Sequence, residues 1–161
     1  MMTRVGSFEA FYEEAHPRVR AALTVIVGDA DAAADATDEA FARAYLHWHR
    51  VAAMEAPQAW VVKVGLNVAR RRGRRRAMER TLLRRIPTPA VLPAQAGEVW
   101  LLVADLPPRQ RTAIVLRYVA DLTEAQIAAA MGVTRGTVSA TLAAAKSRLA
   151  SALADPNEEE S

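Results

Sequence analysis

The most chemically distinctive stretch of this sequence is a cluster of six arginines within residues 70–76, interrupted only by Gly73. Guanidinium groups at this density can neutralise several phosphates, so nucleic acid is the favoured partner of the cluster. The alternative is a solvated basic end of a helix that serves solubility alone. We prefer nucleic acid because the cluster continues an apolar helical segment instead of forming a free tail.

A group of carboxylates at Asp35, Asp38 and Glu39 offers a different kind of chemistry. Carboxylates can bind metal ions or transfer protons, but no paired histidine and no second carboxylate group accompanies these three. His47 and His49 lie on different sides of a helix, because they are two positions apart in the sequence. The sequence contains no cysteine, which excludes disulfides, thiol catalysis and cysteine-ligated zinc. We therefore expect a protein that is not an enzyme, with no catalytic residue, metal site or cofactor.

Residues 122–149 have the pattern of two short helices joined by a tight turn, a helix-turn-helix. Thr123 and Gln126 have the spacing of a capping box, and Gly132 supplies the positive φ that a sharp turn favours. The second helix carries an apolar stripe of Val138, Leu142, Ala145 and Leu149. Such a second helix presents its first residues to the DNA major groove. An ordinary antiparallel helix pair is the alternative.

The rest of the chain also favours helices, because hydrophobic residues make up 52% of it and no strand-like alternation occurs. Pro17 should kink or briefly break the first helix. A loop is expected over residues 51–56. The predicted helices cover about 7–27, about 31–48, a segment from Pro57 through the arginine cluster, 98–106, and a segment from Pro107.

Three prolines, Pro87, Pro89 and Pro93, exclude a continuous helix and mark a linker. The predicted fold is all-α, with two small helical domains joined by a flexible linker and a helix-turn-helix at the end of the second. The boundaries are 1–76 for the first domain, 77–96 for the linker, 97–154 for the second domain and 155–161 for an acidic tail.

The charge distribution follows this division. Residues 1–56 carry five arginines against nine acidic residues, residues 70–85 carry nine arginines against one glutamate, and the tail carries four acidic residues. No apolar run approaches the roughly 18 residues that a membrane span needs, and the N-terminus has no signal-peptide core. We therefore expect a cytoplasmic protein with no membrane contact, whose surfaces serve different partners.

The order of these features resembles the extracytoplasmic-function (group IV) sigma factors of bacterial RNA polymerase. The matching stretches are FEAFYEEAHPRVR (8–20), GDADAAADATDEAFARAY (28–45), PQAWVVKVGLNVARRRGRRR (57–76), LPPRQRTAIVLRYVADLTEAQIAAAMGV (106–133) and GTVSATLAAAKSRL (136–149). The resemblance covers nearly the whole chain apart from the linker and the ends. It implies that the first domain is sigma region 2, which binds core polymerase and the −10 promoter element. It also implies that the second domain is sigma region 4, which recognises the −35 element and binds the polymerase flap.

The resemblance also assigns roles to single residues. It implies that the clamp helices of core polymerase contact Asp35, Asp38, Glu39 and Arg43. It implies that Asn67 forms hydrogen bonds to a −10 base edge, while the arginines after it hold phosphates. The residues before Pro57 match a loop that captures a flipped base. The full set of expected DNA-binding residues is Asn67, Arg70, Arg71, Arg74, Arg75, Arg135, Thr137, Ser139, Thr141 and Lys146. Possible further partners include an anti-sigma factor.

Two stretches depart from the family pattern. Ser139, Thr141, Ala143 and Ala144 occupy a face of the recognition helix that is usually basic in the family, which weakens the expected −35 contact or makes its sequence atypical. The loop after His49 has little aromatic or basic character, and no residue of the −10 base pocket is assigned there.

Three other function classes were weighed. A stand-alone helix-turn-helix regulator would bind duplex DNA without polymerase, but the sequence offers no evident dimerisation surface. An enzyme that acts on nucleic acid would need a metal or nucleophile cluster. A protein that uses only the acidic helix for interaction would leave the arginine cluster unexplained. The sequence therefore favours a sigma factor that gives core RNA polymerase its promoter specificity.

Overall fold

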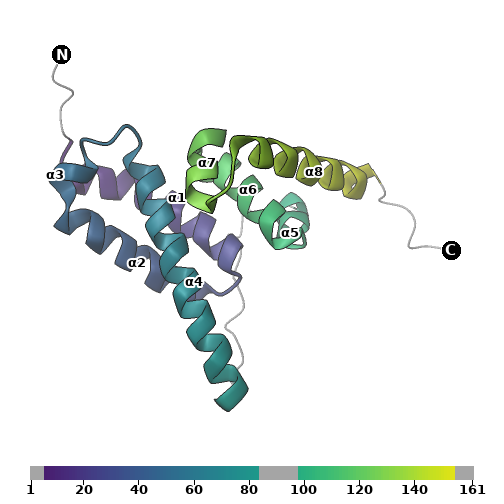
Figure 1. Ribbon diagram of the computed structural model, residues 1–161, viewed down its shortest axis with the longest axis horizontal. Coiled ribbons are helices and arrows are strands. Elements are labelled where there is room, and N and C mark those ends of the chain that lie inside the picture. Colours follow the sequence, from purple (N-terminus) through teal and green to yellow (C-terminus); the bar gives the residue numbers. More distant parts are fainter. Residues whose placement is uncertain (1–5, 84–97, 155–161) are drawn as a thin grey trace.

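The computed structural model describes residues 6–83 and 98–154, and Figure 1 shows that helices dominate this part of the chain. Within these residues the helices are α1 (Phe8–Val27), α2 (Ala30–Leu46), α3 (Trp48–Val51), α4 (Pro57–Leu83), α5 (Glu98–Ala104), α6 (Pro108–Tyr118), α7 (Glu124–Met131) and α8 (Arg135–Ala154). No strand is assigned in the same residues. This confirms the all-α fold class. None of the helices searched in the described part is long and apolar enough to cross a membrane.

Helices α1, α2 and α4 form a first group, in which α2 packs against both α1 and α4. Four alanines of α2 are completely buried and allow close approach of the neighbouring helices: Ala33, Ala36, Ala40 and Ala44. Gly65 of α4 has the same function, because a Cβ atom built there would lie 2.7 Å from Cδ1 of Leu23, which is itself fully buried. Small residues therefore fix the spacing of this group.

Helices α5 to α8 form a second group, in which α6 and α7 pack on α8. The capping box is present, since Thr123 Oγ1 accepts from Gln126 N–H and Gln126 Oε1 accepts from Thr123 N–H. Gly132 ends α7 with a φ of +68°. Val138, Leu142 and Ala145 are buried, and the partly buried Leu149 packs against the same core. These observations confirm the predicted helix-turn-helix.

The two groups contact each other in this structure. Helix α4 packs against α7, and α1 packs against α6. At this junction Gln58 Nε2 donates a hydrogen bond of 2.7 Å to the carbonyl of Ala120, across 62 residues of sequence. The buried apolar residues of both groups belong to one continuous cluster. Figure 1 shows the second group beside the upper half of α4, while the lower half of α4 projects away from it.

Several helix boundaries differ from the predicted ones. Helix α1 passes through Pro17 without a break, because burial of Ala15 and Val19 on either side offsets the lost hydrogen bond. Helix α2 ends at Leu46, and Trp48 starts the short helix α3 because its ring packs on Phe11, with 5.0 Å between ring centroids.

Helix α4 extends beyond the arginine cluster to Leu83, into the stretch assigned to the linker. Residues 77–83 contain neither glycine nor proline, so nothing in their backbone ends the helix. The three prolines that mark the linker, and the acidic tail 155–161, lie outside the described residues.

Candidate nucleic-acid interface and acidic surface

Helix α4 has one exposed polar stripe and one buried apolar face. Lys63, Asn67, Arg70 and Arg74 are exposed and recur at the spacing of successive helical turns. The opposite face contributes Val61, Val62 and Leu66 to the core. Asn67 therefore points to solvent. Sequence reasoning missed Lys63, although its spacing of four residues from Asn67 was a usable signal.

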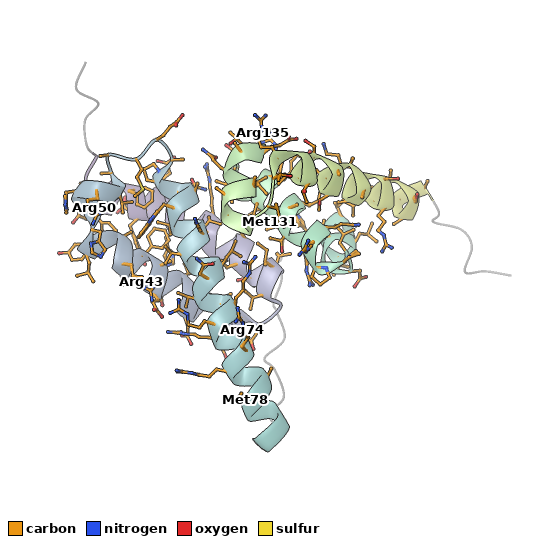
Figure 2. All side chains as sticks on the ribbon, viewed as in Figure 1. Arg43, Arg50, Arg74, Met78, Met131 and Arg135 are labelled. Atoms are coloured by element: carbon orange, nitrogen blue, oxygen red, sulfur yellow. The ribbon has the colours of Figure 1, made fainter. Side chains whose placement is uncertain are left out.

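The arginines after Asn67 differ in what they contact. Arg70, Arg71, Arg74 and Arg75 are exposed, and no ion pair links any of them to another described side chain. Figure 2 shows the labelled Arg74 on the lower half of α4, where side chains surround the helix. Arg72 is different, because its guanidinium group contacts two carboxylates of α2. Among the arginines of the cluster whose side chains the structure describes, these four are therefore available to phosphates.

The acidic surface on α2 consists of Asp35, Asp38, Glu39 and Arg43. Asp38 is the most exposed member, with 70% of its side chain accessible, and its Oδ1 lies 3.4 Å from Nε2 of His16. Glu39 is only 31% exposed, and Arg43 donates to its Oε1 at 2.5 Å from the next helical turn. The described residues contain no group of three or more histidines and carboxylates that could hold a metal ion.

The helix-turn-helix exposes fewer free polar groups than its sequence suggested. Thr137 is part of the helix cap, because its N–H donates to Oγ1 of Thr134 at 3.1 Å. The hydroxyl of Thr141 donates to the carbonyl of Thr137 at 2.7 Å. The Lys146 ammonium group lies 5.7 Å from the ring centroid of Tyr118. Arg135, labelled in Figure 2, is exposed at the start of α8.

A carboxylate that sequence reasoning missed lies at the helix-turn-helix surface. Glu124, the first residue of α7, accepts a hydrogen bond of 2.7 Å from the hydroxyl of Ser139 on α8. Fifteen residues separate the two in sequence, so only the crossing of α7 and α8 brings them together. The recognition surface therefore combines the cation of Arg135 with a negative charge beside Ser139.

A hollow of about 290 Å³ lies next to the loop that precedes Pro57. Its walls include Phe11, Trp48, Ala52 and Pro57. No sequence signal predicts an aromatic wall beside this loop, because Phe11 comes from α1 and Trp48 from α3. The two rings stack at an interplanar angle of 33°.

The expected DNA-binding residues do not form one surface in this structure. Arg74 lies low on α4 in Figure 2, whereas Arg135 lies at the opposite edge of the molecule. The structure instead brings the α4 arginines next to the acidic surface of α2, through Arg72. There are thus two separate candidate nucleic-acid surfaces, one on each helical group.

Comparisons with known proteins agree with this division. The family model for sigma-70 region 2 matches residues 11–79, and the model for sigma-70 region 4 matches residues 96–149. An RNA polymerase sigma-E factor of Streptomyces antibioticus is 31% identical over 129 residues, which cover 77% of this chain and 72% of that protein. The RNA polymerase sigma-E factor of Streptomyces coelicolor is 28% identical over 92% of this chain and 86% of that protein.

Solved structures with the same fold include two proteins in complex with a partner. The sigma factor RpoE of Bartonella quintana, in complex with the anti-sigma factor NepR, superposes with a TM-score of 0.78 at 22% identity, over 92% of this chain and 98% of that one. CnrH, in complex with the cytosolic domain of CnrY, gives a TM-score of 0.60 at 22% identity, over 92% and 88% of the two chains. Two matched regions in the expected order and a relative above 30% identity lead to one conclusion. This chain belongs to the sigma-70 family of RNA polymerase sigma factors, as an extracytoplasmic-function member.

Proposed function

We propose that this sigma factor binds core RNA polymerase, recognises the −10 and −35 promoter elements and promotes transcription initiation, with no catalysis of its own. Residues 1–76 act as the region-2 domain, residues 77–96 as the linker and residues 97–154 as the region-4 domain. The observation that carries the proposal is the exposed stripe of α4, in which Asn67 is followed by unpaired arginines.

The division of labour on α4 follows from the chemistry of its side chains. An exposed amide can donate to and accept from a base edge, so Asn67 supplies sequence recognition. Arg70, Arg71, Arg74 and Arg75 supply charge, which binds phosphates regardless of sequence. Because Asn67 and the arginines share one rigid helix, the phosphate contacts fix the position of the amide along the strand.

The region-4 domain makes the weaker contact in this proposal. Arg135, Thr137, Ser139, Thr141 and Lys146 face the −35 element or its flanking phosphates. The hydroxyls of Ser139 and Thr141 already donate within the protein, and Lys146 lies over Tyr118. We therefore expect −35 recognition to depend on acceptor oxygens and methyl groups more than on charge.

The acidic surface of α2 is the proposed contact for the clamp helices of core polymerase. Asp38 is largely exposed, and Glu39 and Arg43 are half-buried, so a partner can reach all three. The region-4 domain would bind the polymerase flap. An anti-sigma factor is a further proposed partner, because a solved sigma factor of the same fold, RpoE of Bartonella quintana, is complexed with one. The proposed location is the cytoplasm, where polymerase acts.

Run-off transcription with purified core polymerase on a pool of promoter fragments tests the proposal. We expect defined start sites that appear only when this protein is added. A charge-reversed variant of the acidic surface, Asp38→Lys, should lose these start sites, whereas Arg18→Ala, an exposed change on α1, should keep them.

The second candidate function is a regulator that binds duplex DNA without polymerase. The confirmed helix-turn-helix favours it. In that case the isolated protein would shift specific duplex fragments, and no new start site would appear with core polymerase.

A further inference from the structure

Arg72 has a different environment from Arg70, Arg71, Arg74 and Arg75, the other arginines of α4 whose side chains the structure describes. Its Nη2 donates to Oε2 of Glu39 at 2.5 Å, and its Nη1 lies 3.7 Å from Oδ2 of Asp35. The other carboxylate oxygen of Glu39 accepts from Arg43 at 2.5 Å. Glu39 therefore lies between two guanidinium groups, one from its own helix and one from α4.

A hollow of about 240 Å³ lies beside this contact. Its walls are Glu39, Val68, Arg71, Arg72 and Arg75. At about 100° per residue, Arg71 and Arg75 lie on α4 between the Asn67 stripe and the side that carries Arg72. The hollow thus joins the stripe proposed to face DNA to the surface proposed to face polymerase.

The arginines around the hollow favour binding of a phosphate, but the carboxylate of Glu39 opposes it in the free protein. Three guanidinium groups line it, and arginine forks match phosphate oxygens in geometry. The carboxylate of Glu39 occupies one of these forks and would repel an incoming phosphate. The side chain of Arg72 is 40% exposed and that of Glu39 is 31% exposed, so a phosphate can reach Arg72 and a polymerase side chain can reach Glu39. Ion pairs at this exposure contribute little stability, so such an exchange is not costly.

We propose that Arg72 is a conditional ligand for a DNA phosphate. In the free protein Glu39 and Asp35 hold its guanidinium group; a polymerase contact to Glu39 releases it to a phosphodiester in the hollow, beside Arg71 and Arg75. This inference rests on the proposed function, because it takes Glu39 as part of the polymerase contact. By linkage, a phosphate bound to Arg72 also frees Glu39 for polymerase, so each partner increases the affinity for the other.

A substitution at Glu39 can imitate the release of Arg72 without polymerase. Glu39→Gln removes the charge that holds Arg72, and Asp38→Asn removes the same charge from the same helix without touching Arg72. The probe is a fluorescent duplex oligonucleotide, and its anisotropy is followed with the full-length isolated protein over a range of KCl concentrations. Circular dichroism and thermal melting confirm that each variant is folded.

We expect Glu39→Gln to bind the oligonucleotide about five-fold more tightly than Asp38→Asn. We also expect it to steepen the dependence of log K on log[KCl] by about 0.9, the value for one additional phosphate contact. In an Arg72→Gln background, Glu39→Gln should increase the affinity for the oligonucleotide no more than Asp38→Asn does. Equal effects of Glu39→Gln and Asp38→Asn would overturn the proposal. A gain larger than that of Asp38→Asn that persists in the Arg72→Gln background would also overturn it, because that gain would not depend on Arg72.

A second measurement places the exchange in the polymerase complex. We expect Arg72→Gln to weaken promoter binding by the holoenzyme about five-fold without weakening the affinity for core polymerase measured without DNA, because the substitution leaves Glu39 free for the polymerase contact. Unchanged promoter binding would count against the inference. If the wild-type protein forms no promoter complex at all, the proposed function fails, while the oligonucleotide experiment still decides whether Glu39 holds Arg72 away from phosphate.

Discussion

At the scale of single residues, the exposed stripe of α4 separates charge from base recognition. Lys63 lies one turn before Asn67 on the same face and carries a charge but no amide. We expect Lys63→Ala to weaken promoter binding on all templates alike and to reduce the salt slope by about 0.7 to 0.9, the loss of one phosphate contact. Arg18→Ala removes the same charge from α1 and should leave the slope unchanged. A change in base preference with Lys63→Ala would show that the lysine contacts a base.

The carboxylate of Glu124 gives a second prediction at this scale. It lies at the start of the helix-turn-helix and accepts from Ser139, where it should repel nearby phosphates. We expect Glu124→Gln to tighten binding of a −35 duplex several-fold, because glutamine keeps an acceptor for Ser139 but loses the charge. Glu9→Gln makes the same change in the first turn of α1 and is the control. Equal effects of the two variants would mean that Glu124 lies away from the DNA.

Sequence reasoning worked for residues whose environment is local and failed for those that depend on helix crossings. The exposure of Asn67 and the capping box of Thr123 and Gln126 follow from spacing along one helix. The partners of Arg72 and Glu124 come from other helices, and no spacing rule places them. The DNA and polymerase roles of the expected residues stay predictions.

At the scale of elements, the close packing of α4 on α1 depends on Gly65. An alanine Cβ at this position would lie 2.7 Å from a Leu23 side chain that has no accessible surface. We expect Gly65→Ala to lower the free energy of unfolding by about 1 kcal/mol, because overpacking outweighs the gain in helix propensity. Urea denaturation measures the change.

Gly73 provides the matched control on the same helix. Nothing lies within 4 Å of a Cβ atom built there. Gly73→Ala should therefore keep or slightly raise stability. If Gly65→Ala is as stable as Gly73→Ala, the core near Leu23 can adjust, and the glycine is not required for the packing of α4.

Most helices could be predicted from sequence because caps, prolines and apolar periodicity are local signals. Pro57 and Gly132 mark helix ends where they were expected, and α6 begins at Pro108, one residue after the expected Pro107. Helix α3 and the continuity of α1 through Pro17 could not be predicted in this way. Both depend on tertiary contacts, the ring packing of Trp48 and the burial of Ala15 and Val19.

At the scale of the whole molecule, the two helical groups are packed together. This arrangement is too compact to span the distance between the two promoter elements of the proposed function. Elements centred near −35 and −10 are about 25 base pairs apart, or roughly 85 Å at about 3.4 Å per base pair. A compact chain of this length has a radius of gyration of only about 15 Å. The proposed function therefore requires the groups to separate at the contacts of α1 with α6 and of α4 with α7 before both elements are bound.

A covalent link across this junction tests the separation. Glu14 of α1 and Asp121 of the turn after α6 line the same hollow, and the chain has no natural cysteine. We expect the double variant Glu14→Cys, Asp121→Cys to lose run-off transcription when a short bismaleimide links the two thiols. It should keep transcription when it is left unlinked. Single-cysteine variants treated with the same reagent are the control, and full activity of the linked protein would contradict the need for separation.

The central claim is that Asn67 on α4 recognises a base of the −10 element while the neighbouring arginines bind phosphates. The most direct measurement compares wild-type and Asn67→Ala holoenzymes on a promoter library that carries all four bases at each −10 position. We predict that Asn67→Ala removes the base preference at one position, a loss of about 5- to 150-fold for about 1 to 3 kcal/mol, and keeps the preference at the other positions. An unchanged preference at every position, with transcription otherwise intact, would contradict the claim.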